Sequence, residues 1–260
     1  MKVAILGAGV AGPTLAYWLN HAGHEVTLVE IAPEPRTGGY VVDFWGLGYT
    51  VAERMGVLPK VLEAGYAVQQ VRVVDAQGRR VAGFPGEALR RAVDGRVTSV
   101  PRDELAHILL DSVRNDVEVV FGDTVTALDD DGRQVTLQFR HAPPRAFDLV
   151  VGADGLHSGV RRLAFGPEEQ FETYLGYQVA AFQAAGYRPR EELAYVTYAR
   201  PGRQVARFAL RGDRTLFLFL YEASEADAAD AAGRKAAVRA VFGADGWETP
   251  QILAAMAAAP

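Results

Sequence analysis

Two short apolar runs, separated by a helical stretch, occur in the first 30 residues of the chain. Residues 2–6 form a short apolar run, which is typical of a buried parallel strand. A helical stretch follows to about Asn20, and residues 25–30 form a second apolar run that ends in an acid. This pattern predicts a strand–helix–strand unit at the N-terminus.

The middle of the chain predicts more short strands and one amphipathic helix. Pro101 suits a first helical turn, and the apolar residues that follow it lie on one stripe, so we expect a helix over 101–114. The expected strands are 67–75, 78–84, 117–121, 125–128, 134–140 and 147–151.

Longer alternating segments begin after about residue 171. Segments 193–199, 203–210 and 214–221 are separated by turns and predict an antiparallel sheet. The alanine-rich tail from Glu222 predicts one or two helices.

The fold class expected from these elements is α/β, with a Rossmann-type nucleotide-binding domain interrupted by an antiparallel-sheet domain. We assign residues 1–75 and 97–170 to the first domain, and residues 76–96 and 171–260 to the second.

Net charge, cysteine content and hydropathy exclude several classes of protein but do not identify the function. The net charge of −5 argues against a nucleic-acid partner, and the absence of cysteine excludes disulfides and fits a cytoplasmic protein. No uncharged apolar run approaches the length of a membrane span. The N-terminal segment could pass for a signal peptide, but its regular glycine spacing favours nucleotide binding.

Gly7, Gly9 and Gly12 form a GxGxxG sequence between the first strand and the first helix. The first glycine permits a tight turn, the second admits a pyrophosphate, and the third brings the helix close to the strand. Glu30, at the end of the second strand, is placed to accept hydrogen bonds from ribose hydroxyls. A glycine-rich turn that binds nothing is the alternative, and the fingerprint alone does not separate NAD from FAD.

Two further stretches resemble one flavoprotein family. Residues 148–161 (DLVVGADGLHSGVR) are similar to the Asp-Gly motif of the FAD-dependent monooxygenases of the p-hydroxybenzoate hydroxylase type. Residues 100–105 (VPRDEL) resemble the family's arginine at the start of a helix, which reaches the ribityl and phosphate region of the flavin. The resemblance implies FAD as the cofactor. It implies cofactor-binding roles for Asp154 and Arg102, and also for Arg36, Gly39 and Val125 near the flavin or adenine. For Arg36, an ion pair at the surface is the alternative.

The same resemblance implies a reaction. NADH or NADPH would reduce FAD, O2 would add to give a flavin hydroperoxide, and an aromatic or polycyclic small molecule would be hydroxylated. No catalytic side chain is then required. A halogenase or reductase of the same fold, or a non-catalytic FAD-binding module, remains an alternative.

Large rings recur on one side of the strand 214–221. Phe217, Phe219 and Tyr221 point the same way, and in the family this sheet covers the substrate, so we expect these rings either to line the substrate site or to belong to the core. The histidines lack metal-ligand spacing, so we expect no metal site. The oligomeric state stays open.

The family carries a third flavin motif, a Gly-Asp pair at the start of a helix. Gly212-Asp213 lies between expected strands, and the stretch 243–246 (GADG) lacks a preceding apolar strand. We therefore expect residues 1–260 to stop before the final flavin-binding segment.

Overall fold

The protein forms two compact units in the computed structural model, which describes residues 1–224 and 231–259. The first unit comprises Met1–Thr37, Ala52–Ala64 and Asp103–Thr173. The second unit comprises Gly38–Val51, Gly65–Arg102 and Tyr174–Pro260.

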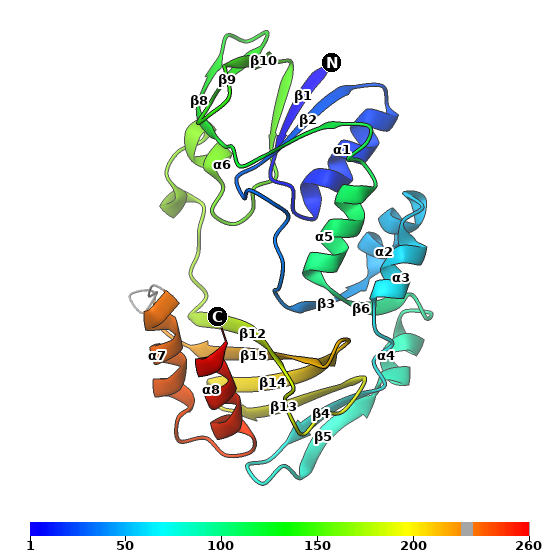
Figure 1. Ribbon diagram of the computed structural model, residues 1–260, viewed down its shortest axis with the longest axis vertical. Helices are drawn as coiled ribbons and strands as arrows, with labels where there is room; N and C mark the ends of the chain where they lie inside the picture. The colour runs from blue at the N-terminus through cyan, green and yellow to red at the C-terminus, as the bar shows by residue number, and fades with distance from the viewer. Residues whose placement is uncertain (225–230, 260) are drawn as a thin grey trace. The chain divides into compact units, whose positions relative to one another are not determined.

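A four-stranded parallel sheet organises the first unit (Figure 1). Its strands are β1 (Lys2–Leu6), β2 (Glu25–Glu30), β7 (Glu118–Phe121) and β11 (Leu149–Gly152), in the order β11-β1-β2-β7. β1 is central and pairs in parallel with both β2 and β11. This parallel sheet confirms the Rossmann-type domain. The strands of such a sheet are covered on both faces, which is why they appear in the sequence as continuous apolar runs.

Both faces of this sheet are covered. On one face, α1 (Ala11–His21) and α5 (Arg102–Asp111) pack on Val3, Ile5 and Leu28, which are fully buried. On the other face, Ala4, Leu6 and Val29 join a core with Leu137 and Phe147. That layer contains β8 (Val125–Asp130), β9 (Val135–Phe139), β10 (Arg145–Phe147) and α6 (Gly159–Ala164). The shorter elements are α2 (Gly46–Arg54), which continues from the second unit into the first, α3 (Leu58–Ala64) and η1 (Glu168–Gln170).

The expected strand over 147–151 divides at Asp148. Phe147 ends β10 in the antiparallel three-stranded sheet, whereas Leu149 opens β11 in the parallel sheet. The Asp148 carboxylate accepts a hydrogen bond from the backbone N–H of Lys2 across 2.7 Å, so it ties the start of β11 to the start of β1.

A six-stranded mixed sheet forms the centre of the second unit, in the order β12-β15-β14-β13-β4-β5. Its strands are β4 (Gln70–Val74), β5 (Arg80–Pro85), β12 (Tyr177–Ala185), β13 (Ala194–Arg200), β14 (Arg203–Leu210) and β15 (Arg214–Glu222). A separate antiparallel pair joins β3 (Val41–Trp45) and β6 (Val97–Pro101). The helices are α4 (Gly86–Ala92), α7 (Ala231–Phe242) and α8 (Thr249–Ala258).

The compact units divide the chain differently from the expected domains. β4 belongs to the six-stranded sheet, because it pairs in parallel with β13, and residues 67–75 therefore do not group with the nucleotide-binding unit. β3 and β6 also lie in the second unit. Apolar periodicity identified β4 as a strand, but it carries no information about a partner that lies more than a hundred residues later.

The helices α7 and α8 cover one face of the six-stranded sheet (Figure 1). Phe217 and Phe219 are fully buried there and Tyr221 is 3% exposed. They pack with Val238, Phe242 and Ile252 of the two helices; the Phe219 and Phe242 ring centroids are 4.8 Å apart. The three rings lie on one face of the sheet as expected, and their packing against α7 and α8 places them in the core, which is the second of the two alternatives.

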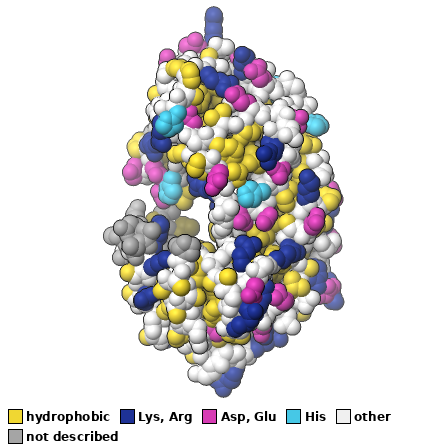
Figure 2. Space-filling model, in the orientation of Figure 1, with side chains coloured by type: hydrophobic (Ala, Val, Ile, Leu, Met, Phe, Trp, Pro, Cys, Tyr) yellow, Lys and Arg dark blue, Asp and Glu magenta, His cyan; other side chains and the backbone are white. Residues whose placement is uncertain are grey.

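No helix within 1–224 and 231–259 combines the length and hydropathy of a membrane span. On the face seen in Figure 2, basic side chains are interspersed with acidic ones rather than gathered in one patch.

Candidate functional site

The carboxyl ends of the parallel strands converge at one edge of the first unit's sheet. Leu6 of β1, Glu30 of β2 and Gly152 of β11 end there side by side. In open α/β sheets, ligands bind in the crevice outside this edge. The chain leaves β1 through the glycine loop, residues 7–12, and leaves β11 through residues 153–158.

The surroundings of the three glycines in the glycine loop differ, and so does the reason why each position favours glycine. Gly7 has a φ of +107°, and a Cβ there would overlap the Ala153 carbonyl. A Cβ at Gly12 would overlap the Gly7 carbonyl oxygen, so this glycine allows α1 to approach β1. Gly9 differs, because a Cβ there would meet nothing within 4 Å. The chain thus leaves open the space in which a pyrophosphate is expected.

The N-terminus of α1 offers donors to that space. Val10 occupies the N-cap position and makes no side-chain cap hydrogen bond. The first N–H groups of a helix lack intrahelical acceptors, and the helix dipole favours an anion there.

Glu30 connects the glycine loop to the end of β2. One carboxylate oxygen accepts the Ala8 N–H across 2.9 Å, and the other accepts the Ala32 N–H across 3.0 Å. The carboxylate is 12% exposed, and Arg36 approaches it to 3.6 Å. Each carboxylate oxygen can accept more than one hydrogen bond, so Glu30 retains capacity for ribose hydroxyls. Gly7, Gly9, Gly12, Glu30 and Arg36 therefore lie together at this edge of the sheet.

Asp123 is a part of this edge that the sequence reasoning missed. The backbone N–H of Asp123 donates to the Glu30 carbonyl across 3.2 Å. The carboxylate accepts hydrogen bonds of 2.8 to 3.1 Å from the N–H groups of Thr124, Arg140, His141 and Ala142. Burial alone would raise the pKa of Asp123, but these four donors hold it below its ordinary value. A signal was present in the turn Gly122-Asp123-Thr124 before an apolar strand.

Val125 follows this clamp at the start of β8. Its side chain is buried against Leu6 and Val29 in the first unit's core. Only its backbone is therefore available to a ligand.

The Asp154 carboxylate is used within its own motif. It accepts the Ser158 hydroxyl across 2.5 Å and the Val160 N–H across 3.1 Å, and so fixes the start of α6. Its Cα would lie 2.8 Å from a Cβ at Gly7, so its backbone contacts the glycine loop. Arg161 donates to the Leu156 carbonyl and to Glu168. The structure thus brings Asp154 to the edge, with its carboxylate engaged in local hydrogen bonds.

Gly39 and Arg102 lie in the second unit. Gly39 has a φ of +110° just before β3. Arg102 is exposed; its backbone N–H donates to the Tyr40 carbonyl across 3.1 Å, and its guanidinium lies 5.9 Å from the Tyr40 ring centroid.

His157 and Asp245 both have local partners. His157 bonds to Glu168 across 2.7 Å, and ligand atoms of His157, Glu168 and Glu172 lie within 4.8 Å of one another. Arg161 also contacts Glu168, so this acid already has a cationic partner. Asp245 is 1% exposed and forms ion pairs with Arg200 and Arg203, which accounts for the GADG stretch without a cofactor.

A family model for the FAD-binding domain matches residues 1–252. The chain belongs to this family. An uncharacterized protein Rv1260 of Mycobacterium tuberculosis is 36% identical over 99% of this chain and 70% of its own length. A flavin-dependent monooxygenase from an unknown prokaryotic organism is 31% identical over 98% of this chain and 66% of its own length.

Solved structures agree with this assignment. The tetracycline destructase Tet(51) superimposes with a TM-score of 0.80 at 27% identity, over 99% of this chain and 67% of that chain. Klebsiella pneumoniae HpxO complexed with FAD and uric acid superimposes with a TM-score of 0.79 at 24% identity, over 98% of this chain and 65% of that chain, and so shares the fold. The expected relationship to the FAD-dependent monooxygenases of the aromatic hydroxylase type is confirmed. The open space at Gly9 and the donors at α1 fit the ADP half of FAD.

Proposed function

We propose that this chain is the FAD- and substrate-binding part of a monooxygenase that uses NADH or NADPH and O2 to hydroxylate a planar aromatic or polycyclic small molecule. The observation that carries the proposal is the hydrogen bond between Glu30 and the glycine loop, which assembles a dinucleotide-binding edge in a chain of this family. FAD, when bound, supplies the redox chemistry.

The residues of the first unit would hold the cofactor by its ADP half. The N–H groups at the start of α1 and the open space at Gly9 would receive the pyrophosphate. Glu30 would accept hydrogen bonds from the adenosine ribose, and its charge disfavours a 2′-phosphate at this position. Arg36 lies beside Glu30 and would limit the charge repulsion between that carboxylate and the phosphates.

Asp154 and Arg102 support the proposal in different ways. Asp154 would act as a positioning residue, because its carboxylate fixes α6 while its backbone contacts the glycine loop. For Arg102 the proposed role at the ribityl or phosphate region rests on the family resemblance alone; its side chain is exposed in the second unit.

The substrate wall is proposed on the face of the six-stranded sheet opposite α7 and α8. Phe217, Phe219 and Tyr221 occupy the helix-covered face, so the intervening Leu218 and Leu220 point the other way and are only partly buried. On the adjacent strand β12, Val179 is 60% exposed. An apolar, partly exposed sheet face suits a flat ring system, and the similarity to a tetracycline destructase supports a polycyclic substrate.

The proposal is tested by following NADH and NADPH oxidation by the FAD-loaded protein with a panel of phenols and polycyclic compounds under isotopically labelled O2. Incorporation of labelled oxygen into one compound, with stimulation of NAD(P)H oxidation by that compound, is the expected result. Oxidation without oxygen transfer would indicate a reductase. Halide-dependent product would indicate a halogenase, and FAD binding without reduction would indicate a non-catalytic module.

A further inference from the structure

A cavity of about 350 Å³ lies in the second unit, on the face of the six-stranded sheet that carries α7 and α8. Its floor is one cross-strand row: Val196 of β13 pairs with Arg72 of β4 on one side and with Arg207 of β14 on the other. Directly paired residues point to the same face, so both arginine side chains rise on either side of Val196. None of these residues belongs to the FAD-binding edge.

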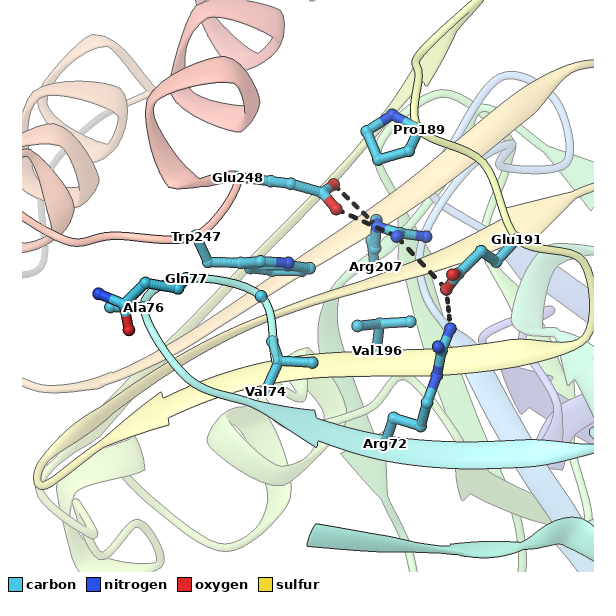
Figure 3. Close-up of a pocket in the computed structure, with 11 residues that line it drawn as sticks. Arg72, Val74, Ala76, Gln77, Pro189, Glu191, Val196, Arg207, Trp247 and Glu248 are labelled. Carbon is cyan, nitrogen blue, oxygen red and sulfur yellow. Dashed lines mark hydrogen bonds and ion pairs between the residues drawn. The ribbon is translucent and has the colours of Figure 1, made fainter. Parts of the chain in front are cut away.

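Three connections form the walls of this cavity, which we name the ion-paired cavity. The β12–β13 connection contributes Pro189 and Glu191, the connection before α8 contributes Trp247 and Glu248, and the β4–β5 turn contributes Gln77. Figure 3 shows Pro189, Glu191, Trp247 and Glu248 around Val196, with Gln77 on the far side of Trp247. Loops that converge on a rigid sheet are a frequent arrangement for binding sites.

Glu248 pairs with Arg207, whereas Glu191 contacts both Arg72 and Arg207. Glu248 holds Arg207 in a bidentate pair, with distances of 2.9 and 3.1 Å, and Arg207 is 4% exposed. This buried pair fixes the floor. Glu191 is 40% exposed and contacts Arg72 directly and Arg207 across 3.5 Å (Figure 3). The Arg72–Glu191 pair is therefore the accessible one, and it presents donors and a carboxylate acceptor side by side.

Two features show that the cavity is not ordinary core packing. Trp247 adopts a φ of +58°, which is rare for a bulky residue, and its backbone N–H donates to the Ala76 carbonyl across 2.6 Å. The buried Nε–H of Arg72 reaches no acceptor within the described part of the chain. Trp247, with its strained backbone, and Arg72, with its incompletely bonded guanidinium, thus both line the cavity.

We propose that the ion-paired cavity binds a small planar aromatic lactam or cyclic amide. The charges of two arginines and two glutamates balance, which disfavours a strong anion such as a phosphate. An amide edge matches the accessible pair, because its carbonyl accepts from Arg72 while its N–H donates to Glu191. The ring lies beside the indole of Trp247 over the valine floor, and the volume suits one or two fused rings.

The probe is carbostyril, the bicyclic lactam of quinoline, titrated calorimetrically into the whole FAD-saturated protein. The O-methyl ether of its lactim form has the same rings without the N–H donor. We expect the lactam to bind about tenfold more tightly than the ether, as one charge-assisted hydrogen bond implies. Equal affinities, or no lactam binding, would overturn the proposal.

Variants locate the binding. Glu191→Gln is expected to weaken lactam binding about tenfold, whereas Glu192→Gln, at the exposed neighbouring acid that pairs with Arg190, is expected to leave it unchanged. Gln77→Trp, in the exposed β4–β5 turn, is expected to block the cavity mouth without disturbing the ion pairs. Lactam affinity that survives both Glu191→Gln and Gln77→Trp would place the ligand elsewhere on the protein and refute the assignment.

Discussion

Glu30 and Ala8 are joined by a hydrogen bond of 2.9 Å from the backbone N–H to the carboxylate, so the end of β2 fixes the conformation of the glycine loop. A second bond to Ala32 holds the same carboxylate from the other side. The acid therefore shapes the loop in addition to its expected contact with the ribose.

Glu30→Ala is expected to weaken FAD affinity by about 1–3 kcal/mol, because it removes charge-assisted bonds both to the cofactor and to the loop. Equilibrium dialysis or flavin fluorescence would measure the loss. Glu25→Ala, at the exposed opposite end of β2, is the matched control and is expected to bind FAD normally. Normal FAD retention in Glu30→Ala would mean that this carboxylate does not support the site.

Gly9→Ala and Gly12→Ala are expected to affect different properties: the first lowers FAD affinity alone, and the second also lowers stability. A methyl group at Gly12 overlaps the Gly7 carbonyl, so Gly12→Ala is expected to lower the melting temperature as well as FAD binding. A methyl group at Gly9 meets nothing in the protein, so Gly9→Ala is expected to fold normally and to lose FAD affinity by about tenfold or more. Thermal unfolding beside flavin content would separate the two effects; a Gly9→Ala protein that retains FAD fully would exclude a pyrophosphate at that point.

Phe219→Ala is expected to destabilise the second unit by about 3–5 kcal/mol, since the ring is fully buried against Phe242. Its neighbour Leu218 faces the other side of the sheet and is partly buried. Leu218→Ala is expected to cost less stability and, under the proposed function, to weaken substrate binding. Denaturant unfolding and substrate titration on both variants would test this; a reversed pattern would return the substrate to the helix-covered face.

Protonation of Asp245 is expected to lower the free energy of unfolding at acid pH. Hydrogen bonds from Arg203 lower its pKa below the ordinary value of 3.8 against the opposing effect of burial, and Arg200 adds to the lowering. A lowered pKa in the folded state means that the stabilisation is complete above about pH 4 and is lost as the pH falls further. Asp245→Asn is expected to cost about 1–3 kcal/mol at neutral pH and to flatten the acid limb of the stability curve.

Unfolding free energies between neutral pH and pH 3 would measure this effect. Asp213→Asn, in the exposed β14–β15 turn, is the matched control and is expected to retain the acid limb of the parent protein. An unaltered acid limb in Asp245→Asn would assign the acid sensitivity to other carboxylates.

Local signals account for what the sequence predicted well. The strand, the glycine spacing and Glu30 lie within 30 residues, and their roles follow from short-range sterics and charge. Long-range pairing accounts for what it missed. Nothing near β4 indicates its partner β13, and nothing near Phe219 indicates that α7 would cover it, because apolar alternation describes a face without naming its neighbour. Asp123 was missed because its four donors come mostly from a turn 17 to 19 residues away.

Both sheets are completed by late segments of the chain, and this has a consequence for biosynthesis. β1 receives its partner β11 only once Leu149 has been made, and β4 receives β13 only once Ala194 has been made. At a ribosomal rate of about 5–20 residues per second, β1 waits on the order of ten seconds with one edge unpaired. An exposed apolar strand edge is a template for aggregation during that interval. We therefore expect the nascent chain, rather than the finished protein, to be the form most exposed to aggregation, and we expect slower translation between these segments to lower the yield of folded protein.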